Sequence, residues 1–257
     1  GYITVTGNPT VDLGNDVAIC QGDSTLLDAG AGHTNYLWNT GDTTQTIYAD
    51  TAGTYNVTVG NGMPSNTSSL IFDGFDDYVN CGTGNPVIHN SSTVTMSAWI
   101  NSDDNETWRA IATRWNNYGQ KNWWFGLADN GRIHFGESSS SVFYSDNNSY
   151  NNDGNWYYLT VVKNGSTINF YSNGINTGSR SSSVAQINDN SEKLLLGAKN
   201  NADNSGMSSD LYDGKIGRFE IWNRALSTSE IQFYMSSLPN GNESGLVGLW
   251  NFSEGSG

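Results

Sequence analysis

The stretch GNWYYLTVVKNGSTINFYSNG, residues 154–174, predicts a β-hairpin in the middle of the chain. Residues 156–162 and 167–171 are rich in the aromatic and β-branched side chains that favour strands. Between them, residues 163–165 read Lys-Asn-Gly, and Asn-Gly is the dipeptide that tight hairpin turns prefer. A second turn of the same kind follows at 172–174. The surrounding region is therefore expected to be an antiparallel sheet.

Strand signals separated by polar turns extend outward from this hairpin in both directions. In VTMSAWI, residues 94–100, even-numbered residues would face one side of a sheet and odd-numbered residues the other. Further strands are expected at 123–127, 132–135, 193–197 and 214–222, with a turn at 129–131.

One short helix is expected near the end of the chain. Ser227 can act as its N-cap, and Glu230, three residues later, completes a capping box. Ile231 and Tyr234 then supply an apolar stripe. Residues 69–257 therefore predict a β-sandwich with one short helix.

Residues 1–64 predict a separate, smaller antiparallel sandwich, because strand signals recur about every ten residues. The opening GYITVTGNP resembles TYNVTVGNG at 54–62, so residues 1–8 are either the last strand of a preceding module or a linker. Residues 60–69 carry no periodicity and form the expected boundary. The chain is therefore expected to be all-β, with two domains at 1–64 and 69–257.

The acidic composition disfavours two classes of partner. Lys and Arg total 11 against 25 Asp and Glu, which gives a net charge of −14. No basic run is present that could neutralise phosphates, so neither nucleic acid nor an anionic membrane is an expected partner. No apolar run approaches the roughly 18 residues of a membrane span. Any export signal is expected to lie outside this chain.

The two cysteines, Cys20 and Cys81, are far apart in the sequence, and neither has a metal-ligand partner nearby. They are either two unpaired thiols or one disulfide between the two halves of the chain. Sequence spacing does not decide between these alternatives, because bridging depends on the distance between the Cα atoms.

The first 60 residues resemble the immunoglobulin-like or PKD-like repeats of exported bacterial surface proteins. The resemblance rests on DLGNDVAICQGDSTLLDAG at 12–30, YLWNTGDTTQTI at 36–47 and GTYNVTV at 53–59. It implies that this segment is a spacer in a longer, multidomain chain that is secreted or held at the cell surface.

Residues 70–257 resemble the laminin-G-like domains of the concanavalin A-like lectin/glucanase superfamily, which implies a jelly-roll sandwich. SLIFDGFDDYVNCG at 69–82, LADNGRIHF at 127–135 and GKIGRFEIWNRALSTSEI at 214–231 carry the resemblance, together with 94–100 and 154–165. LVGLWNFSEGSG at 246–257 looks like the segment that normally opens such a domain. It either supplies an edge strand from the C-terminal side or begins a further module.

The same resemblance implies a structural calcium ion. Calcium binds several carboxylate and carbonyl oxygens, and Asp73, Asp76, Asp77 and Asp213 could supply them. Asp residues beside glycine also favour tight turns without any metal.

Large aromatic residues gather between residues 108 and 124, among arginine, lysine and asparagine side chains. Sugar rings offer C–H faces to aromatic planes and hydroxyl groups to polar side chains, so this mixture suits a carbohydrate. Strand alternation would bury either Trp123 or Trp124, and we expect Trp115, Tyr118 and the other of these two indoles to be exposed. His134 and Tyr144 could line the same sheet face with Arg132, although a strand histidine is also often structural. The candidate ligand-binding residues are Trp108, Arg114, Trp115, Tyr118, Trp123, Trp124, Arg132, His134 and Tyr144.

Catalysis is not expected. Glycoside hydrolases need two carboxylates flanking the scissile bond, whereas Glu137 and Glu220 are isolated in the sequence. The predicted function is a non-catalytic module that binds a polysaccharide or glycan, with a calcium ion as support. The alternative is a structural or protein–protein interaction module of a surface adhesin, without a glycan site.

Overall fold

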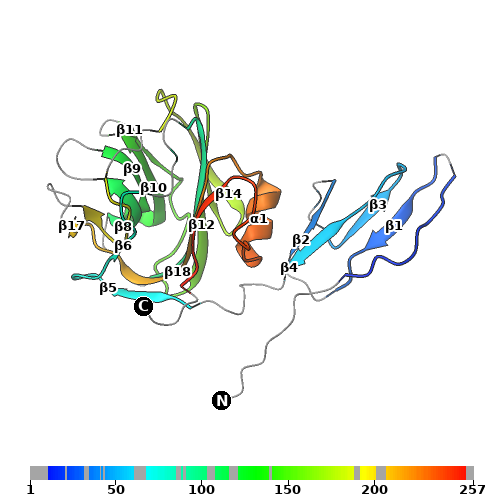
Figure 1. Ribbon diagram of the computed structural model, residues 1–257, viewed down its shortest axis with the longest axis horizontal. Helices are drawn as coiled ribbons and strands as arrows, with labels where there is room; N and C mark the ends of the chain where they lie inside the picture. Colours follow the sequence, from blue (N-terminus) through cyan, green and yellow to red (C-terminus); the bar gives the residue numbers. More distant parts are fainter. Residues whose placement is uncertain are drawn as a thin grey trace, which may run out of the picture. The chain divides into compact units, whose positions relative to one another are not determined.

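Figure 1 shows a computed structural model of the chain, which confirms that the protein is almost entirely β-structure. Contacts divide the chain into two units, Gly1–Ser65 with Ser227–Leu238, and Asn66–Leu226 with Pro239–Gly257. The structure describes residues 11–20, 22–31, 35–40, 42, 44–60, 68–84, 88, 91–102, 108–115, 121–138, 141–187, 192–200 and 207–252.

The first unit contains two antiparallel strand pairs. β1 (Thr25–Asp28) pairs with β3 (Thr46–Ala49), and β2 (Asn35–Trp38) pairs with β4 (Val57–Gly60). The assignment of this unit to immunoglobulin-like repeats stays a prediction.

Trp38 lies at the centre of the core of the first unit and is 1% exposed. Its indole N–H donates a hydrogen bond to the carbonyl of Thr44, at 2.8 Å. The Tyr36 hydroxyl donates to the carbonyl of Gly30, also at 2.8 Å. Both polar groups are thus satisfied as their rings are buried, as a stable small core requires.

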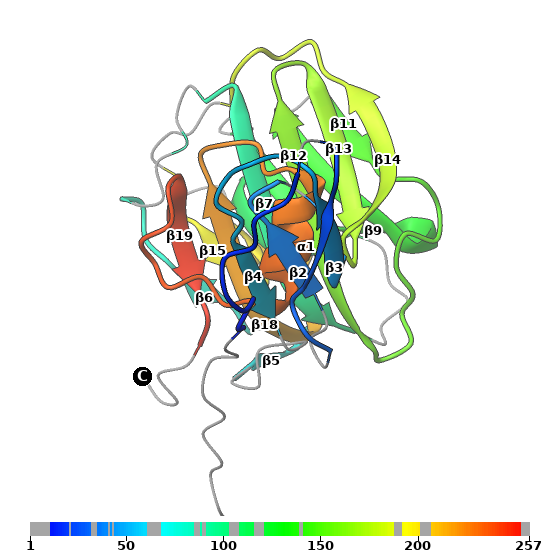
Figure 2. The ribbon, with the colours of Figure 1, turned by 90° about the vertical axis from the view of Figure 1, so that its right-hand side faces the viewer.

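The second unit is a jelly-roll sandwich of two sheets, visible as two layers in Figure 1. The first sheet has six strands in the order β11-β10-β9-β8-β15-β6, and the second runs β14-β13-β12-β7-β18-β19, with β5 also paired to β18. Figure 2 looks toward the second sheet, with β14 at one side and β19 at the other. The strands of the first sheet are β6 (Val79–Asn80), β8 (Arg109–Trp115), β9 (Lys121–Ala128), β10 (Arg132–Ser138), β11 (Ser141–Tyr144) and β15 (Leu195–Leu196). Those of the second are β5 (Leu70–Asp73), β7 (Thr93–Asn101), β12 (Trp156–Asn164), β13 (Thr167–Ser172), β14 (Ile175–Ser181), β18 (Asp213–Trp222) and β19 (Leu246–Trp250). A small separate pair is formed by β16 (Lys199–Asn200) and β17 (Met207–Ser209).

The core lies between the two sheets and follows the predicted alternation. Along β7, Val94, Met96, Ala98 and Ile100 are all buried in this core. The predicted hairpin is present, with β12 and β13 paired from Leu159 opposite Ser172 to Asn164 opposite Thr167. Local sequence signals therefore gave the central antiparallel pairs correctly.

The helix α1 (Thr228–Ser236) begins at the predicted capping box. The Glu230 backbone N–H donates to Ser227 Oγ at 3.2 Å, and the Ser227 backbone N–H donates to Glu230 Oε2 at 2.7 Å. Ile231 is the buried apolar residue of this helix. By its contacts the helix groups with the first unit, whereas the predicted second domain, 69–257, includes it.

Two short strands from opposite ends of the second unit share one edge of β18. β19 pairs with residues Phe219–Trp222 of β18, and β5 pairs with Asp213–Ile216. Residues 246–250 thus supply an edge strand from the C-terminal side, which was the first of the two predicted alternatives.

A buried ion pair joins the two sheets at one end of the sandwich. Lys163 Nζ of β12 lies 2.9 Å from Glu137 Oε2 of β10, and both side chains are fully buried. Lys163 Nζ also donates to the Val184 carbonyl at 2.8 Å, and the Ser182 hydroxyl donates to Glu137 Oε1. Each charge is therefore matched within the core.

Two further predictions concern the cysteines and the membrane. Cys20 and Cys81 are free thiols in this structure, and burial raises the pKa of the Cys81 thiol to about 11. None of the helical segments in the described part of the chain has the length and apolar character needed to cross a bilayer.

Candidate functional site

The outer face of the six-stranded sheet, turned away from the sandwich core, carries two glycines on neighbouring strands. These are Gly126 of β9 and Gly136 of β10. A Cβ atom at Gly136 would approach the Trp115 ring to 3.1 Å, and one at Gly126 would approach Trp124 Nε1 to 2.5 Å. Only glycine allows the two indoles to lie so close to the backbone of the sheet.

Five aromatic side chains contact one another on this face, and we call them the outer-face cluster. Trp115 meets Trp124 edge-on, with ring centroids 6.1 Å apart. Trp124 lies 5.1 Å from His134, which stacks on Tyr144 at 5.2 Å. Trp108 meets both His134 and Tyr144 edge-on, at 5.2 and 5.9 Å. The predicted sharing of one face by His134, Tyr144 and Arg132 is confirmed.

Trp108 is the exposed member of the outer-face cluster. Its surface is 40% exposed, and its backbone φ is +68°. A bulky residue rarely adopts this left-handed conformation, which costs on the order of 1–3 kcal/mol. Such strain persists only where the surroundings impose it, and it concentrates at functional sites.

The other tryptophans are buried, which corrects the expectation that Trp115 and one of Trp123 or Trp124 would be exposed. Trp115 is 9% exposed and Trp124 is 4% exposed, because they pack on each other and over the glycines. Trp123 is fully buried in the sandwich core, on the opposite face of β9. Trp115 and Trp124 therefore support the surface from beneath, and Trp123 takes no part in it.

Two cations lie over the outer-face cluster. The guanidinium of Arg132 lies 4.5 Å from the centre of the Tyr144 ring, and Arg132 also pairs with Asp129. Lys199 Nζ lies 5.3 Å from the centre of the Trp124 ring, and it pairs with Asp210. Such contacts hold the rings in place and leave donors near their edges.

His134 is uncharged and packs between Trp124 and Tyr144 in this cluster. It is 4% exposed, and neither ring nitrogen has a hydrogen-bond partner among the described residues. Burial, assisted by the nearby charge of Arg132, lowers the pKa of His134 to about 3. Burial also raises the pKa of the Tyr144 hydroxyl, so both groups stay neutral near pH 7.

Two of the predicted ligand residues do not join this surface in the described structure. Arg114 is 2% exposed, and its Nη1 donates to the Thr83 carbonyl at 3.4 Å. Its positive charge also acts to lower the pKa of the Cys81 thiol, against the larger effect of burial. Arg114 is therefore an interior residue, and its expected place in the ligand site is wrong. Tyr118 lies outside the described residues.

The predicted metal ligands come together at the β5–β6 loop. Ligand oxygens of Asp73, Asp76 and Asp77 lie within 4.8 Å of one another. Asp213 faces Asp73 across the β18–β5 pair, and a Cβ at Gly74 would lie 3.3 Å from Asp213 Oδ2. Three clustered carboxylates with a fourth beside them suit a hard cation such as calcium.

Two of the buried glutamates, Glu137 and Glu220, each form an ion pair with a basic side chain. Glu137 pairs with Lys163 inside the core. On the other face of the seven-stranded sheet, Glu220 Oε1 lies 2.5 Å from Arg218 Nε, and Glu220 Oε2 accepts from Trp222 Nε1 at 3.1 Å. Burial raises the pKa of the Glu220 carboxyl, against the attraction of Arg218. The two carboxylates thus face different partners and do not form a pair.

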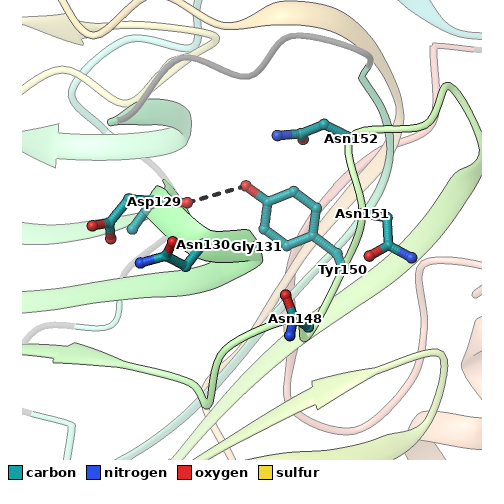
Figure 3. Close-up of a pocket in the computed structure, with 8 residues that line it drawn as sticks. Asp129, Asn130, Gly131, Asn148, Tyr150, Asn151 and Asn152 are labelled. Atoms are coloured by element: carbon teal, nitrogen blue, oxygen red, sulfur yellow. Dashed lines mark hydrogen bonds between the residues drawn. The ribbon is translucent and has the colours of Figure 1, made fainter.

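The structure also shows a polar pocket that the sequence analysis missed, and we call it the amide pocket (Figure 3). It has a volume of about 320 Å³ and lies between the β9–β10 turn and the loop after β11. The turn at 129–131 was recognised, but the Asn-rich run after residue 146 gave no sign that it lies opposite. Its lining residues are Ala128, Asp129, Asn130, Gly131, Asn148, Tyr150, Asn151 and Asn152.

Comparison with known proteins identifies a family. The profile described as the concanavalin A-like lectin/glucanases superfamily matches residues 72–232, which is more than half of the chain. No curated protein matches the sequence.

Several solved structures share the fold at low sequence identity. A candidate carbohydrate binding protein from Bacteroides ovatus has a TM-score of 0.58 and 14% identity, over 92% of this chain and 62% of that one. The CBM40 module of the Ruminococcus gnavus IT-sialidase, bound to α2,3 sialyllactose, has a TM-score of 0.52 and 8% identity, over 66% of this chain and 99% of that one. Domain 4 of AbnA, a GH43 extracellular arabinanase from Geobacillus stearothermophilus, in complex with arabinotriose, has a TM-score of 0.50 and 15% identity, over 66% of this chain and 76% of that one. The chain thus spans less than two thirds of the Bacteroides ovatus protein.

Proposed function

Because the chain belongs to the concanavalin A-like lectin/glucanases superfamily, we propose that its jelly-roll unit is a non-catalytic module that binds a glycan or polysaccharide. The observation that carries this proposal is Trp108. It is an exposed indole held in a strained backbone conformation above the outer-face cluster. A strained, exposed aromatic ring is what a sugar-stacking surface needs, because it presents a fixed apolar plane at the surface.

The surroundings of Trp108 supply the polar part of such a site. Arg132, whose side chain is 25% exposed, carries guanidinium donors near the half-buried Tyr144 ring. A sugar ring stacked on Trp108 could accept hydrogen bonds from these donors through its hydroxyl oxygens. Trp115, Trp124 and His134 would hold the surface from beneath.

The solved relatives support a carbohydrate ligand in general terms. Domain 4 of AbnA was solved with arabinotriose, and the CBM40 module was solved with sialyllactose. Fold similarity at these identities does not name the sugar. The net charge of −14 favours neutral glycans over acidic ones.

The carboxylates support a role without catalysis. Hydrolysis of a glycosidic bond requires two acidic side chains that flank the bond. In the described structure the buried carboxylates of Glu137 and Glu220 are each paired with a cation, and they lie on different sheets. We further propose that the chain is part of a longer secreted or cell-surface protein, in which the 1–64 domain is an immunoglobulin-like spacer.

Trp108 gives the direct test of glycan binding. Trp108→Ala should weaken binding by about 30-fold, the equivalent of a hot-spot loss of about 2 kcal/mol. Quenching of tryptophan fluorescence during titration with a panel of neutral and acidic polysaccharides would measure the change. Trp108→Gly, which relieves the left-handed backbone, should bind as weakly while being at least as stable as the native chain.

Tyr48→Ala is the matched control, because Tyr48 is a 72% exposed aromatic residue in the first unit. This variant should bind like the native chain. If no polysaccharide in the panel quenches the native protein, glycan binding at the outer-face cluster is ruled out. The alternative, a structural or protein–protein interaction module, is favoured by the burial of Trp115 and Trp124, and that result would support it.

We also propose that Asp73, Asp76, Asp77 and Asp213 hold a calcium ion that braces the β5–β6 loop. Calcium at 100 times its Kd should stabilise the fold by about 2.7 kcal/mol, which raises Tm by roughly 5–10 °C for a domain of this size. The shift should disappear with excess chelator and in Asp76→Asn/Asp77→Asn. Asp16→Asn, a change at an exposed acid in the first unit, should keep it. Equal Tm values with calcium and with chelator would contradict the proposal.

A further inference from the structure

The amide pocket has walls that are fixed to each other by backbone hydrogen bonds. The Asn148 backbone N–H donates to the Asn130 carbonyl at 2.8 Å, and the Ser149 N–H donates to the Gly131 carbonyl at 2.8 Å. A Cβ at Gly131, whose φ is +63°, would overlap the Tyr150 carbonyl oxygen, so the loop packs directly on the turn. Residues 129–131 and 148–150 therefore form one rigid frame.

The loop after β11 is also anchored beyond the pocket. The Asp146 backbone N–H donates to the Thr177 carbonyl at 2.7 Å, and its carboxylate pairs with Arg180 at 2.8 Å. On the other side, Asn151 Nδ2 donates to the Tyr157 hydroxyl at 3.3 Å. A site held in this way before a ligand arrives loses little conformational entropy on binding.

The chemistry of the lining is that of amide groups. Four asparagine side chains, at 130, 148, 151 and 152, surround the buried ring of Tyr150, as Figure 3 shows. Each amide offers both a carbonyl acceptor and N–H donors, which is the combination that neighbouring hydroxyl groups require. Asn152 Oδ1 is buried and has no hydrogen-bond partner among the described residues, so rotating this amide to turn its oxygen toward a ligand hydroxyl would break no existing hydrogen bond of that oxygen.

The charge of the pocket is balanced. Asp129 is the one ionisable acid in the lining, and it already pairs with Arg132. A charged ligand would find no unpaired charge in the lining to oppose its own. A volume of about 320 Å³ lies at the low end of ligand pockets, which run from roughly 300 to 1,000 Å³. The pocket therefore suits one small, uncharged and richly hydroxylated unit.

We propose that the amide pocket binds a single uncharged sugar unit, such as the end of a glycan chain. This inference rests on the proposed glycan-binding function and adds a second site to it. Arg132 links the two sites, because the same side chain pairs with Asp129 at the pocket and lies over Tyr144 in the outer-face cluster. A glycan seated in the pocket has the aromatic surface next to it for the rest of its chain.

The experiment uses the whole chain, labelled with ¹⁵N, and four probes that are too small to span both sites. The probes are the methyl glycosides of mannose, galactose, glucose and arabinose, followed through backbone amide shifts in NMR spectra. We expect saturable shifts for at least one glycoside at 129–131 and 148–152. These shifts should persist in Trp108→Ala, because the pocket does not depend on the exposed indole.

Asn148→Asp should weaken this binding at least tenfold, because it replaces the amide donors with a carboxylate. The change tolerates the φ of +57° at this position, since both Asn and Asp adopt left-handed conformations. Asn152→Ala should also lose binding without losing stability, because it removes a buried acceptor that has no partner. Asn164→Asp, the same change at the exposed last residue of β12, is the matched control and should bind normally.

Three outcomes would overturn the inference. One is that no glycoside produces saturable shifts at the pocket, and another is that Asn148→Asp and Asn164→Asp bind equally well. The third is that calcium chloride alone shifts these amides and sugars do not, which would make the pocket a cation site. If no glycoside shifts the pocket amides while polysaccharides quench fluorescence in a way that depends on Trp108, the pocket is rejected as a sugar site and the proposed function is retained. Glycoside binding in the pocket with no polysaccharide quenching would support the pocket and reject the outer-face cluster as a glycan site.

Discussion

Replacing Lys163 with methionine should lower the free energy of unfolding by about 3–5 kcal/mol, which is the usual cost of breaking a buried ion pair from one side. The variant leaves the carboxylate of Glu137 with no cation, at a position that is fully buried. The Ser182 hydroxyl that donates to Glu137 cannot offset the loss of a whole charge. Urea unfolding, followed by tryptophan fluorescence, would measure the change.

The double variant Glu137→Gln/Lys163→Met separates the cost of an unpaired charge from the value of the pair. Removing both charges should recover most of the stability, because a buried pair contributes little more than an apolar pair of similar volume. If the double variant is as unstable as Lys163→Met, packing rather than charge determines the effect, and the electrostatic explanation is wrong.

Trp123→Ala should also cost about 3–5 kcal/mol, because its ring fills the space between the two sheets. The loss combines the transfer of a large ring out of the core with the cavity that it leaves. Calorimetry and denaturant unfolding would each measure the change.

Trp123→Phe provides the matched control for this core position. The indole N–H of Trp123 has no hydrogen-bond partner among the described residues, so phenylalanine removes an unsatisfied donor and part of the ring. We expect a loss below about 1.5 kcal/mol, the range for similar apolar exchanges. A loss as large as that of Trp123→Ala would mean that the core needs the full volume of the indole and does not repack around a smaller ring.

The sequence predicted those parts of the fold that follow from local rules. β7, the β12–β13 hairpin and the capping box of α1 each depend on neighbouring residues, namely strand alternation, an Asn-Gly turn and a Ser–Glu pair three residues apart. The sequence did not determine that β19 pairs with β18, because pairing between segments that are distant in the chain leaves no local pattern.

The candidate site was harder to predict, because its details depend on irregular strands and on buried neighbours. β8 pairs with β9 through two register shifts, after Ala110 and after Arg114. These shifts place Trp115 against Trp124 and leave Arg114 in the interior, which simple alternation does not give. The burial of Trp115 depends further on Gly136, a residue on the next strand but one.

The amide pocket could not be predicted for a related reason. Asparagine-rich turns are typical of loops, so the residues at 130 and 148–152 carry no distinctive pattern by themselves. The pocket exists because the left-handed turn at 129–131 and a loop some twenty residues later bind each other's backbones.

The shared edge of β18 has a topological consequence for protein engineering. Leu70, at the start of β5, pairs with Ile216, and Trp250, at the end of β19, pairs with Phe219. Three residues of strand separate these partners, a span of roughly 10 Å. The entry and exit of the jelly roll are therefore neighbours, and a short peptide could join them. New ends could then be opened at the exposed turn between β12 and β13, which would give a circular permutant that keeps the sheet order.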